Sequence, residues 1–236
     1  MAVKEYSYAK QGQLRLSTHF RVHEFASKDG NYLYSDTVLI DDALVAKLEE
    51  LYQRLCDIGY DVKYININSG YRTRQHDIDA GGNGSGQHTL GKAADFDVQV
   101  SSRKPYVIDR SGTYYIDAQY LCSVMQDLGW KGIGYIGGKA VHGDTRTGKW
   151  WGNEVTGASI SDFYTAFSVP KVDTALMVKG DIDGSGVVDT TDARLALDYA
   201  VGKITLTDWQ VIRGDVNNDG KMDTTDARLI LEMAVA

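Results

Sequence analysis

Two stretches near the end of the chain carry oxygen-bearing side chains in the same register, one beginning at Asp181 and the other at Asp215. Ca²⁺ takes six to eight oxygen ligands, and a loop supplies them from positions 1, 3, 5, 7, 9 and 12 with glycine at the sharp turn of position 6. Gly186 and Gly220 hold that sixth position. The repeat therefore predicts two Ca²⁺ sites. The predicted ligands are Asp181, Asp183, Ser185, the carbonyl of Val187, Asp189 and Asp192 in the first loop, and Asp215, Asn217, Asp219, the carbonyl of Lys221, Asp223 and Asp226 in the second.

These loops differ from the EF-hand pattern in two ways. Position 12 is aspartate rather than glutamate, and we expect no amphipathic helix before either loop. Each loop instead leads directly into a helix, predicted over residues 192–201 and 226–235 from their apolar residues. Over about residues 176–236 this arrangement resembles a type I dockerin.

The resemblance implies a partner, the cohesin module of a cellulosome scaffold protein. In dockerins the residues at loop positions 10 and 11 contact cohesin, which implies that role for Thr190, Thr191, Thr224 and Thr225. The residues alone leave a second interpretation open, in which these threonines only cap the following helices. Because so small a domain buries little apolar surface, we expect it to be largely disordered without Ca²⁺.

A second group of residues could hold a catalytic metal. His88 precedes Asp95 by seven residues, and His142 follows on a predicted strand. Two imidazoles and one carboxylate are a common ligand set for a catalytic Zn²⁺ that keeps its fourth position open. Spacing alone does not establish such a site, since a histidine on a strand is often structural.

The motifs around these residues resemble the zinc D-alanyl-D-alanine carboxypeptidase family of peptidoglycan peptidases, which has the Hedgehog/DD-peptidase fold. In order they are LSTHFRVHEF, SGYRT, H-x-x-G-x-A-x-D, GIGY and V-H-x-D-x-R, over about residues 14–151. The resemblance implies one Zn²⁺ held by His88, Asp95 and His142. It also implies that Arg72 orients the substrate, and that Gln87 fixes its loop or meets the substrate.

The general base is less clearly marked. Some relatives carry glutamate three residues before the last histidine, but this chain has Lys139 there. Asp144 lies two residues after His142 on the same predicted strand face and is our candidate base. The alternative is that Asp144 hydrogen-bonds a ligand histidine or Arg146 and only supports the site.

The elements that must position these residues indicate an α+β fold. A helical stripe opens at Asp41–Asp42 and ends at Gly59, strands are predicted over 62–68 and 94–100, and Asp117 caps a second helix. Residues 132–136 and 140–144 form a predicted hairpin. Because helices and strands do not alternate as parallel units require, we expect a small antiparallel sheet with helices, followed by an all-α calcium-binding domain.

The composition of the chain argues against a nucleic-acid partner and a membrane span. Most of the net charge of −7 lies in residues 180–236, and no basic patch indicates a nucleic-acid partner. The sequence shows no apolar run long enough to span a membrane. Two cysteines, Cys56 and Cys122, could form one disulfide, but both fall inside predicted helices and free thiols are favoured.

Taken together, the residues and the resemblances predict a secreted, cellulosome-associated zinc peptidase. Its domain would cover residues 12–168, with a linker over 169–175 and a dockerin over 176–236. An export signal is expected to have been removed ahead of the present initial Met. The substrate class implied is an amide bond in peptidoglycan stem peptides or cross-links. Two alternatives are a cell-wall-binding module with a structural zinc and a metal-free carbohydrate hydrolase with two facing carboxylates.

Overall fold

The computed structural model describes residues 2–101, 107–110, 113–169, 178–183, 185, 187–206, 208–217 and 219–235 of the 236-residue chain. The chain divides into two compact units, one of residues 1–52 and 62–171 and the other of residues 53–61 and 172–236. Apart from residue 169, the predicted linker over 169–175 lies outside the described residues, as does Gly186. The predicted domain boundaries therefore stay predictions.

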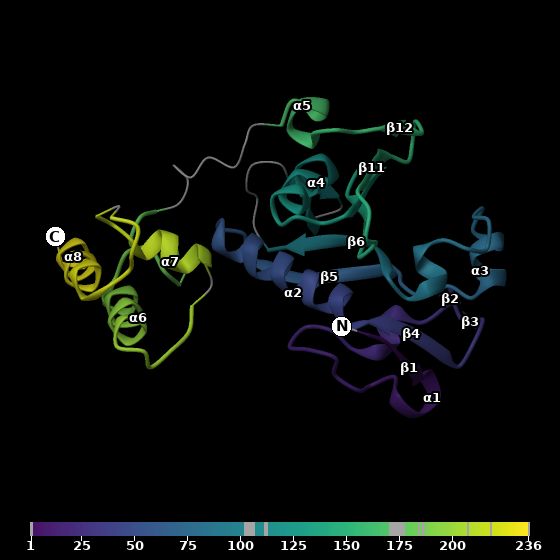
Figure 1. Cartoon of the computed structure of the whole chain (residues 1–236), viewed down its shortest axis with the longest axis horizontal. Helices are drawn as coiled ribbons and strands as arrows, with labels where there is room; N and C mark the ends of the chain where they lie inside the picture. The colour runs from purple at the N-terminus through teal and green to yellow at the C-terminus, as the bar shows by residue number, and fades with distance from the viewer. Residues whose placement is uncertain are drawn as a thin grey trace. The chain divides into compact units, whose positions relative to one another are not determined.

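The first unit is built on one eight-stranded sheet, drawn in Figure 1. Its strands follow the order β12-β11-β9-β10-β6-β8-β7, with β5 also paired to β6. All pairs are antiparallel except that of β11 with β9. The α+β prediction is confirmed. The strands are β5 Val62–Ser69, β6 Ala93–Val100, β7 Val107–Arg110, β8 Thr113–Ile116, β9 Gly132–Gly137, β10 Ala140–Asp144, β11 Trp150–Asn153 and β12 Ala158–Ser159.

Two amphipathic helices contribute much of the core. In α2, Asp42–Asp57, Leu48, Leu51 and Leu55 are fully buried, and burial of one such side chain contributes about 1.5–3 kcal/mol. The helix α4, Ala118–Asp127, starts at the predicted cap, where Asp117 accepts hydrogen bonds from the next backbone N–H groups. Cys56 on α2 and Cys122 on α4 form no disulfide with each other.

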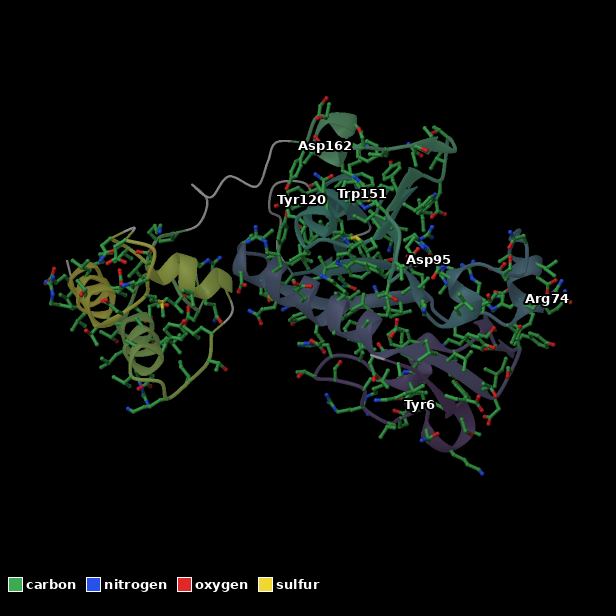
Figure 2. The ribbon with its side chains drawn as sticks, in the orientation of Figure 1. Tyr6, Arg74, Asp95, Tyr120, Trp151 and Asp162 are labelled. Atoms are coloured by element: carbon green, nitrogen blue, oxygen red, sulfur yellow. The ribbon has the colours of Figure 1, made fainter. Side chains whose placement is uncertain are left out.

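Smaller elements surround this frame. They are β1 Val3–Ser7, α1 Tyr8–Gln11, the 3-10 helix η1 Val22–Phe25, β2 Lys28–Asp29, β3 Tyr32–Leu33, β4 Thr37–Asp41, α3 Arg74–Asp79, the 3-10 helix η2 Gln87–Leu90 and α5 Phe163–Phe167. Of these, α3 and η2 lie in the connection between β5 and β6. The connection places His88 of η2 near the start of β6, where Asp95 lies; Asp95 is labelled in Figure 2.

The hairpin of β9 and β10 sets the register that matters for the site. Gly134 lies opposite His142, and His142 lies opposite Asp95 of β6. Ser69 of β5 pairs with Asp95, and Gly152 of β11 pairs with Gly134. Paired residues on neighbouring strands point to the same face of the sheet. These pairs therefore form one row of residues across β5, β6, β10, β9 and β11, in which His142 and Asp95 lie side by side.

The opposite face of β10 is packed. Helix α4 lies against β9 and β10. A β-carbon on Gly143 would collide with Trp130 and reach within 2.9 Å of Met125. One face of the hairpin is therefore core, and the face with His142 is left for polar residues.

After residue 177, the described part of the second unit forms the helices α6 Thr190–Ala200, α7 Asp208–Gly214 and α8 Thr224–Ala234. Helices α6 and α8 pack together, and the buried core contains Ile182, Ala193, Ala196, Met222, Ala227 and Ile230. The two helices predicted after the loops are confirmed, and each starts two residues earlier than expected. The sequence did not predict α7, a helix of seven residues that ends directly before Asp215 of the second loop, whereas only an amphipathic helix was expected to be absent there.

Within the ranges given above, the structure contains no helix that is both long and apolar enough to cross a membrane.

Candidate metal centres

The three predicted zinc ligands converge on one point. Nε2 of His88 lies 3.2 Å from Oδ1 of Asp95 and 3.2 Å from Nδ1 of His142, and Nδ1 of His142 lies 2.9 Å from the same Oδ1. The three ligand atoms belong to the 3-10 helix η2 and to strands β6 and β10. Segments far apart in sequence therefore meet at one cluster.

The spacing of these atoms fits Zn²⁺. Ligand atoms about 2.0–2.2 Å from a tetrahedral zinc lie somewhat more than 3 Å from each other. The side chains of His88, Asp95 and His142 are 8%, 16% and 9% exposed, so the cluster is shielded but reachable from solvent. Three protein ligands with a fourth position left open is the arrangement of a catalytic rather than a structural zinc.

Each histidine is held so that one nitrogen faces the cluster. Nδ1 of His88 lies 2.7 Å from the carbonyl oxygen of Gly70, which as an acceptor fixes the proton on Nδ1 and leaves Nε2 as the ligand. On His142 the roles are reversed, because Nε2 lies 3.0 Å from Oδ2 of Asp144 and Nδ1 faces the cluster. Such partners fix the ring orientation and the tautomer.

Asp95 is held from its other side by Arg72. Nη2 of Arg72 donates to Oδ2 of Asp95 at 2.6 Å, and its Nε donates to Oγ of Ser69 at 2.7 Å. Burial favours the neutral carboxyl, but hydrogen bonds to His142 and His88 outweigh it and hold the pKa of Asp95 well below its usual range. Arg72 thus lies at the site as predicted, with two of its donors committed to Ser69 and Asp95; its role toward substrate stays a prediction.

Asp144 lies behind His142, away from the cluster. Its carboxylate is fully buried and accepts from the guanidinium of Arg146 at 2.5–2.9 Å. Burial lowers the pKa of His142, but hydrogen bonds to Asp144 and Asp95 outweigh it and raise the pKa to about 9. These contacts favour the supporting role for Asp144 over that of general base.

Two glycines of β9 make room for carboxylates on this face. A β-carbon on Gly132 would overlap the carboxylate of Asp144, and one on Gly134 would overlap Oε1 of Glu154. The same β-carbon on Gly134 would lie 3.0 Å from Cβ of His142. The two glycines of the GIGY motif thus leave room for the carboxylates of Asp144 and Glu154, which lie against the backbone of β9.

Sequence reasoning did not single out Glu154. The residue lies ten positions after Asp144, and only the parallel pairing of β11 with β9 carries it back to the site. Of the two tryptophans that follow Asp144, Trp150 meets the ring of His142 edge-on at 5.9 Å between centroids, whereas Trp151 packs on Phe163.

Gln87 opens η2, one residue before His88, and is half-buried. Its carbonyl accepts from the backbone N–H of Lys92 at 3.0 Å, and its side-chain amide makes no hydrogen bond to the residues that the structure describes. The first contact helps to fix the loop, and the predicted contact of Gln87 with substrate stays a prediction.

The first acidic loop brings Asp181, Asp183 and Asp192 together, with ligand atoms within 4.8 Å of one another. Asp192 is fully buried and organises the loop by accepting from the backbone N–H groups of Ile182, Asp183 and Asp189 at 2.7–3.0 Å. The side-chain oxygen of Ser185 lies 3.0 Å from the carbonyl of Val187, so both predicted ligands are in the same loop turn.

The second loop repeats this plan. Asp226 is fully buried and accepts from the N–H groups of Val216, Asn217 and Asp223 at 3.0–3.3 Å. Asp215 accepts from the N–H groups of Asp219 and Gly220, and Asn217 donates to Asp219. The N–H of Lys221 donates to Asp219 at 2.9 Å, which places its carbonyl in the same turn. Carboxylate and carbonyl oxygens of this kind suit Ca²⁺.

The four threonines do not cap the helices with their side chains. The N-cap residues are Asp189 and Asp223, which accept from the N–H groups of Thr191 and Thr225. The capping alternative is therefore wrong, because the aspartate at loop position 9 already takes that role. Thr190, Thr191, Thr224 and Thr225 are all exposed, as a contact surface requires.

Comparison with known proteins gives two family matches. The model of the family Peptidase M15 matches residues 18–108, which include Arg72, His88 and Asp95 but end before His142. The model of the dockerin type I domain matches residues 179–233. No curated protein and no solved structure matches the chain. Peptidases of the M15 family depend on zinc and dockerins bind calcium, in agreement with the ligand types at the two kinds of site. Two separate segments of the chain are thus similar to known families, residues 18–108 to Peptidase M15 and residues 179–233 to the type I dockerin domain.

Proposed function

We propose that residues 12–168 form a zinc peptidase domain that hydrolyses amide bonds in peptidoglycan stem peptides or their cross-links. Residues 176–236 would attach this domain to a cohesin module of an extracellular cellulosome scaffold. The family matches support a metallopeptidase-type hydrolase joined to a dockerin. The peptidoglycan substrate comes from the resemblance of the motifs between residues 14 and 151.

The convergence of His88, Asp95 and His142 carries the proposal. These donors would hold the zinc, with Nε2 of His88, Oδ1 of Asp95 and Nδ1 of His142 as ligand atoms. When bound, zinc supplies a Lewis acid that polarises a carbonyl and lowers the pKa of water from 15.7 to about 7.

The remaining residues position this set. Arg72 holds Asp95 through Oδ2, and Asp144 holds His142 through Nε2. Arg72 also lines a polar hollow of about 300 Å³ together with Asn68, Ser69 and His76. A substrate carboxylate lying there would compete with Asp77 for Nη1 of Arg72, which lies 3.8 Å from Oδ1 of Asp77, and a planar guanidinium is well suited to such a group.

Defined stem peptides and cross-linked muropeptides test the proposal. Incubation of the zinc-loaded full chain with each of them should release new amine groups, and mass spectrometry should locate the broken bond. A His142→Ala variant serves as the inactive control.

The principal alternative is a non-catalytic module that grips the cell wall and holds zinc structurally. Retention of the protein on purified cell walls, with zinc bound and no cleavage of any stem peptide, would favour that alternative. A closed site with four protein ligands would also support it.

The dockerin part of the proposal is tested separately. Binding to an immobilised cohesin module should require Ca²⁺ and should weaken when exposed threonines such as Thr190 and Thr224 are replaced by bulky or charged residues. Unchanged binding after all four threonines are replaced would place the cohesin contact elsewhere.

A further inference from the structure

We propose that Glu154 is the general base of the reaction and that Gly134 is the residue that admits it to the site. This inference rests on the proposed peptidase function and names the residue that handles the proton. Neither family match includes Glu154, because the Peptidase M15 match ends at residue 108.

The first support is strand register. Gly152 of β11 pairs with Gly134 of β9, and Gly134 pairs with His142 of β10. Residues two apart on a strand point to the same face, so the side chain of Glu154 emerges on the face of Gly152 and His142. The backbone N–H of Glu154 donates to the carbonyl of Tyr135 at 2.9 Å, which continues the ladder past the end of β11.

The second support is the space over Gly134. Oε1 of Glu154 lies so close to the position of a β-carbon on residue 134 that the two would clash, and that position is 3.0 Å from Cβ of His142. The carboxylate therefore lies beside the backbone of a metal ligand, on the same face of the sheet.

The third support is that the neighbouring carboxylates are committed to other partners. Asp95 binds Arg72, and Asp144 binds Arg146. Asp97, on the same face of β6, is buried and accepts from Asn66, Asn68 and Lys139.

Glu154, by contrast, is exposed, and its carboxylate makes no hydrogen bond or ion pair with any part of the chain that the structure describes. A general base needs a carboxylate with free lone pairs, and Glu154 has them.

The proton balance of the step is simple. Glu154 takes one proton from the attacking water as the water oxygen bonds to the scissile carbonyl carbon. The C–N bond then breaks, and Glu154 returns that proton to the leaving nitrogen, which departs as an amine. The new carboxylic acid loses its proton to solvent, and Glu154 ends as the carboxylate with which it began.

Glu154→Gln in the full chain tests this assignment, with Glu5→Gln as the matched control because Glu5 is an exposed glutamate on β1 outside the site. The turnover number of Glu154→Gln should fall by roughly 10²–10⁴-fold, with KM and zinc content unchanged. Gly134→Ala, which displaces the carboxylate, should also slow turnover, and the double variant should be no slower than Glu154→Gln alone.

A second readout does not depend on turnover. In the Co²⁺-loaded protein, azide binding followed by visible absorption should become tighter in Glu154→Gln, because a like charge near the anion has been removed. Glu5→Gln should bind azide as the parent protein does.

The outcomes separate the two proposals. A parent protein that cleaves stem peptides, with a Glu154→Gln variant of equal turnover and equal azide affinity, overturns the assignment of Glu154. A parent protein that cleaves no stem peptide overturns the peptidase proposal and the catalytic role together, and azide titration then reports only whether the carboxylate faces the metal.

Discussion

Nε2 of His142 lies 3.0 Å from a buried oxygen of Asp144, on the side of the ring opposite the nitrogen that faces Asp95. The Asp144 carboxylate is in turn held by Arg146. A chain of contacts thus runs from a guanidinium through a carboxylate and an imidazole to the candidate metal position. These contacts favour a role in which Asp144 sets the tautomer and orientation of His142.

Asp144→Asn should therefore lower the affinity for zinc while leaving the turnover number of the zinc-saturated enzyme close to that of the parent. Loss of such a supporting partner typically costs 10- to 100-fold in metal affinity or activity. Competition with a chromophoric chelator measures the affinity, and turnover should recover at saturating zinc. Zinc affinity equal to that of the parent, with turnover lost at saturation, would restore Asp144 as the base.

Arg72→Lys should also loosen the site, since a lysine cannot donate to Ser69 and Asp95 at once through a rigid fork. We expect lower zinc affinity and a higher KM, with the larger effect in Arg72→Ala. Arg74→Lys, in the adjacent helix α3, is the matched control. If Arg72→Lys raised KM while zinc affinity stayed at the parent value, Arg72 would serve the substrate alone.

The motifs were sufficient to predict that His88, Asp95 and His142 come together, because the first two lie in one short motif and His142 in another. Their role as zinc ligands stays a prediction. The predicted helix stripe and hairpin were also recovered, since both are local patterns. Glu154 could not be found in this way. Its place depends on a parallel pairing between β11 and β9, and strand register is set by tertiary packing rather than by local composition.

Helix α7 was missed for a related reason. It has only seven residues, too few for a helical stripe to stand out, and isolated helices of that length are unstable. Its last residue, Gly214, packs against Met222 and Ile182 of the second unit's core, so tertiary contacts hold it in place. The cap at Asp189 was missed because that residue was assigned only to Ca²⁺.

His142→Ala should abolish zinc binding and peptide cleavage while leaving cohesin binding intact. The ligand lies on β10, in a different compact unit from the acidic loops. Zinc content by elemental analysis and cohesin affinity by calorimetry check the two halves of this expectation. Loss of cohesin capture in this variant would contradict the predicted division into two domains.

Removal of Ca²⁺ should unfold the C-terminal helices and spare the peptidase. The core of this unit contains few residues, and its loops concentrate carboxylates that repel one another without a cation. Excess EGTA should reduce the helical circular dichroism signal and abolish cohesin binding, and added Ca²⁺ should restore both. Cleavage of a soluble stem peptide should not change, provided that zinc is resupplied.

Asp192→Ala tests whether Asp192 supports the first loop structurally as well as binding Ca²⁺. Asp192 is buried and, besides its predicted role as a ligand, accepts hydrogen bonds from three backbone N–H groups. Asp198→Ala removes an aspartate of the same helix that pairs with Lys203 outside the loop, and should keep parental Ca²⁺ affinity. Asp192→Ala should lose one Ca²⁺ per chain by calorimetry. Since unpaired N–H groups then remain in the loop, added Ca²⁺ should not restore full helicity, and full recovery would show that Asp192 acts only as a ligand.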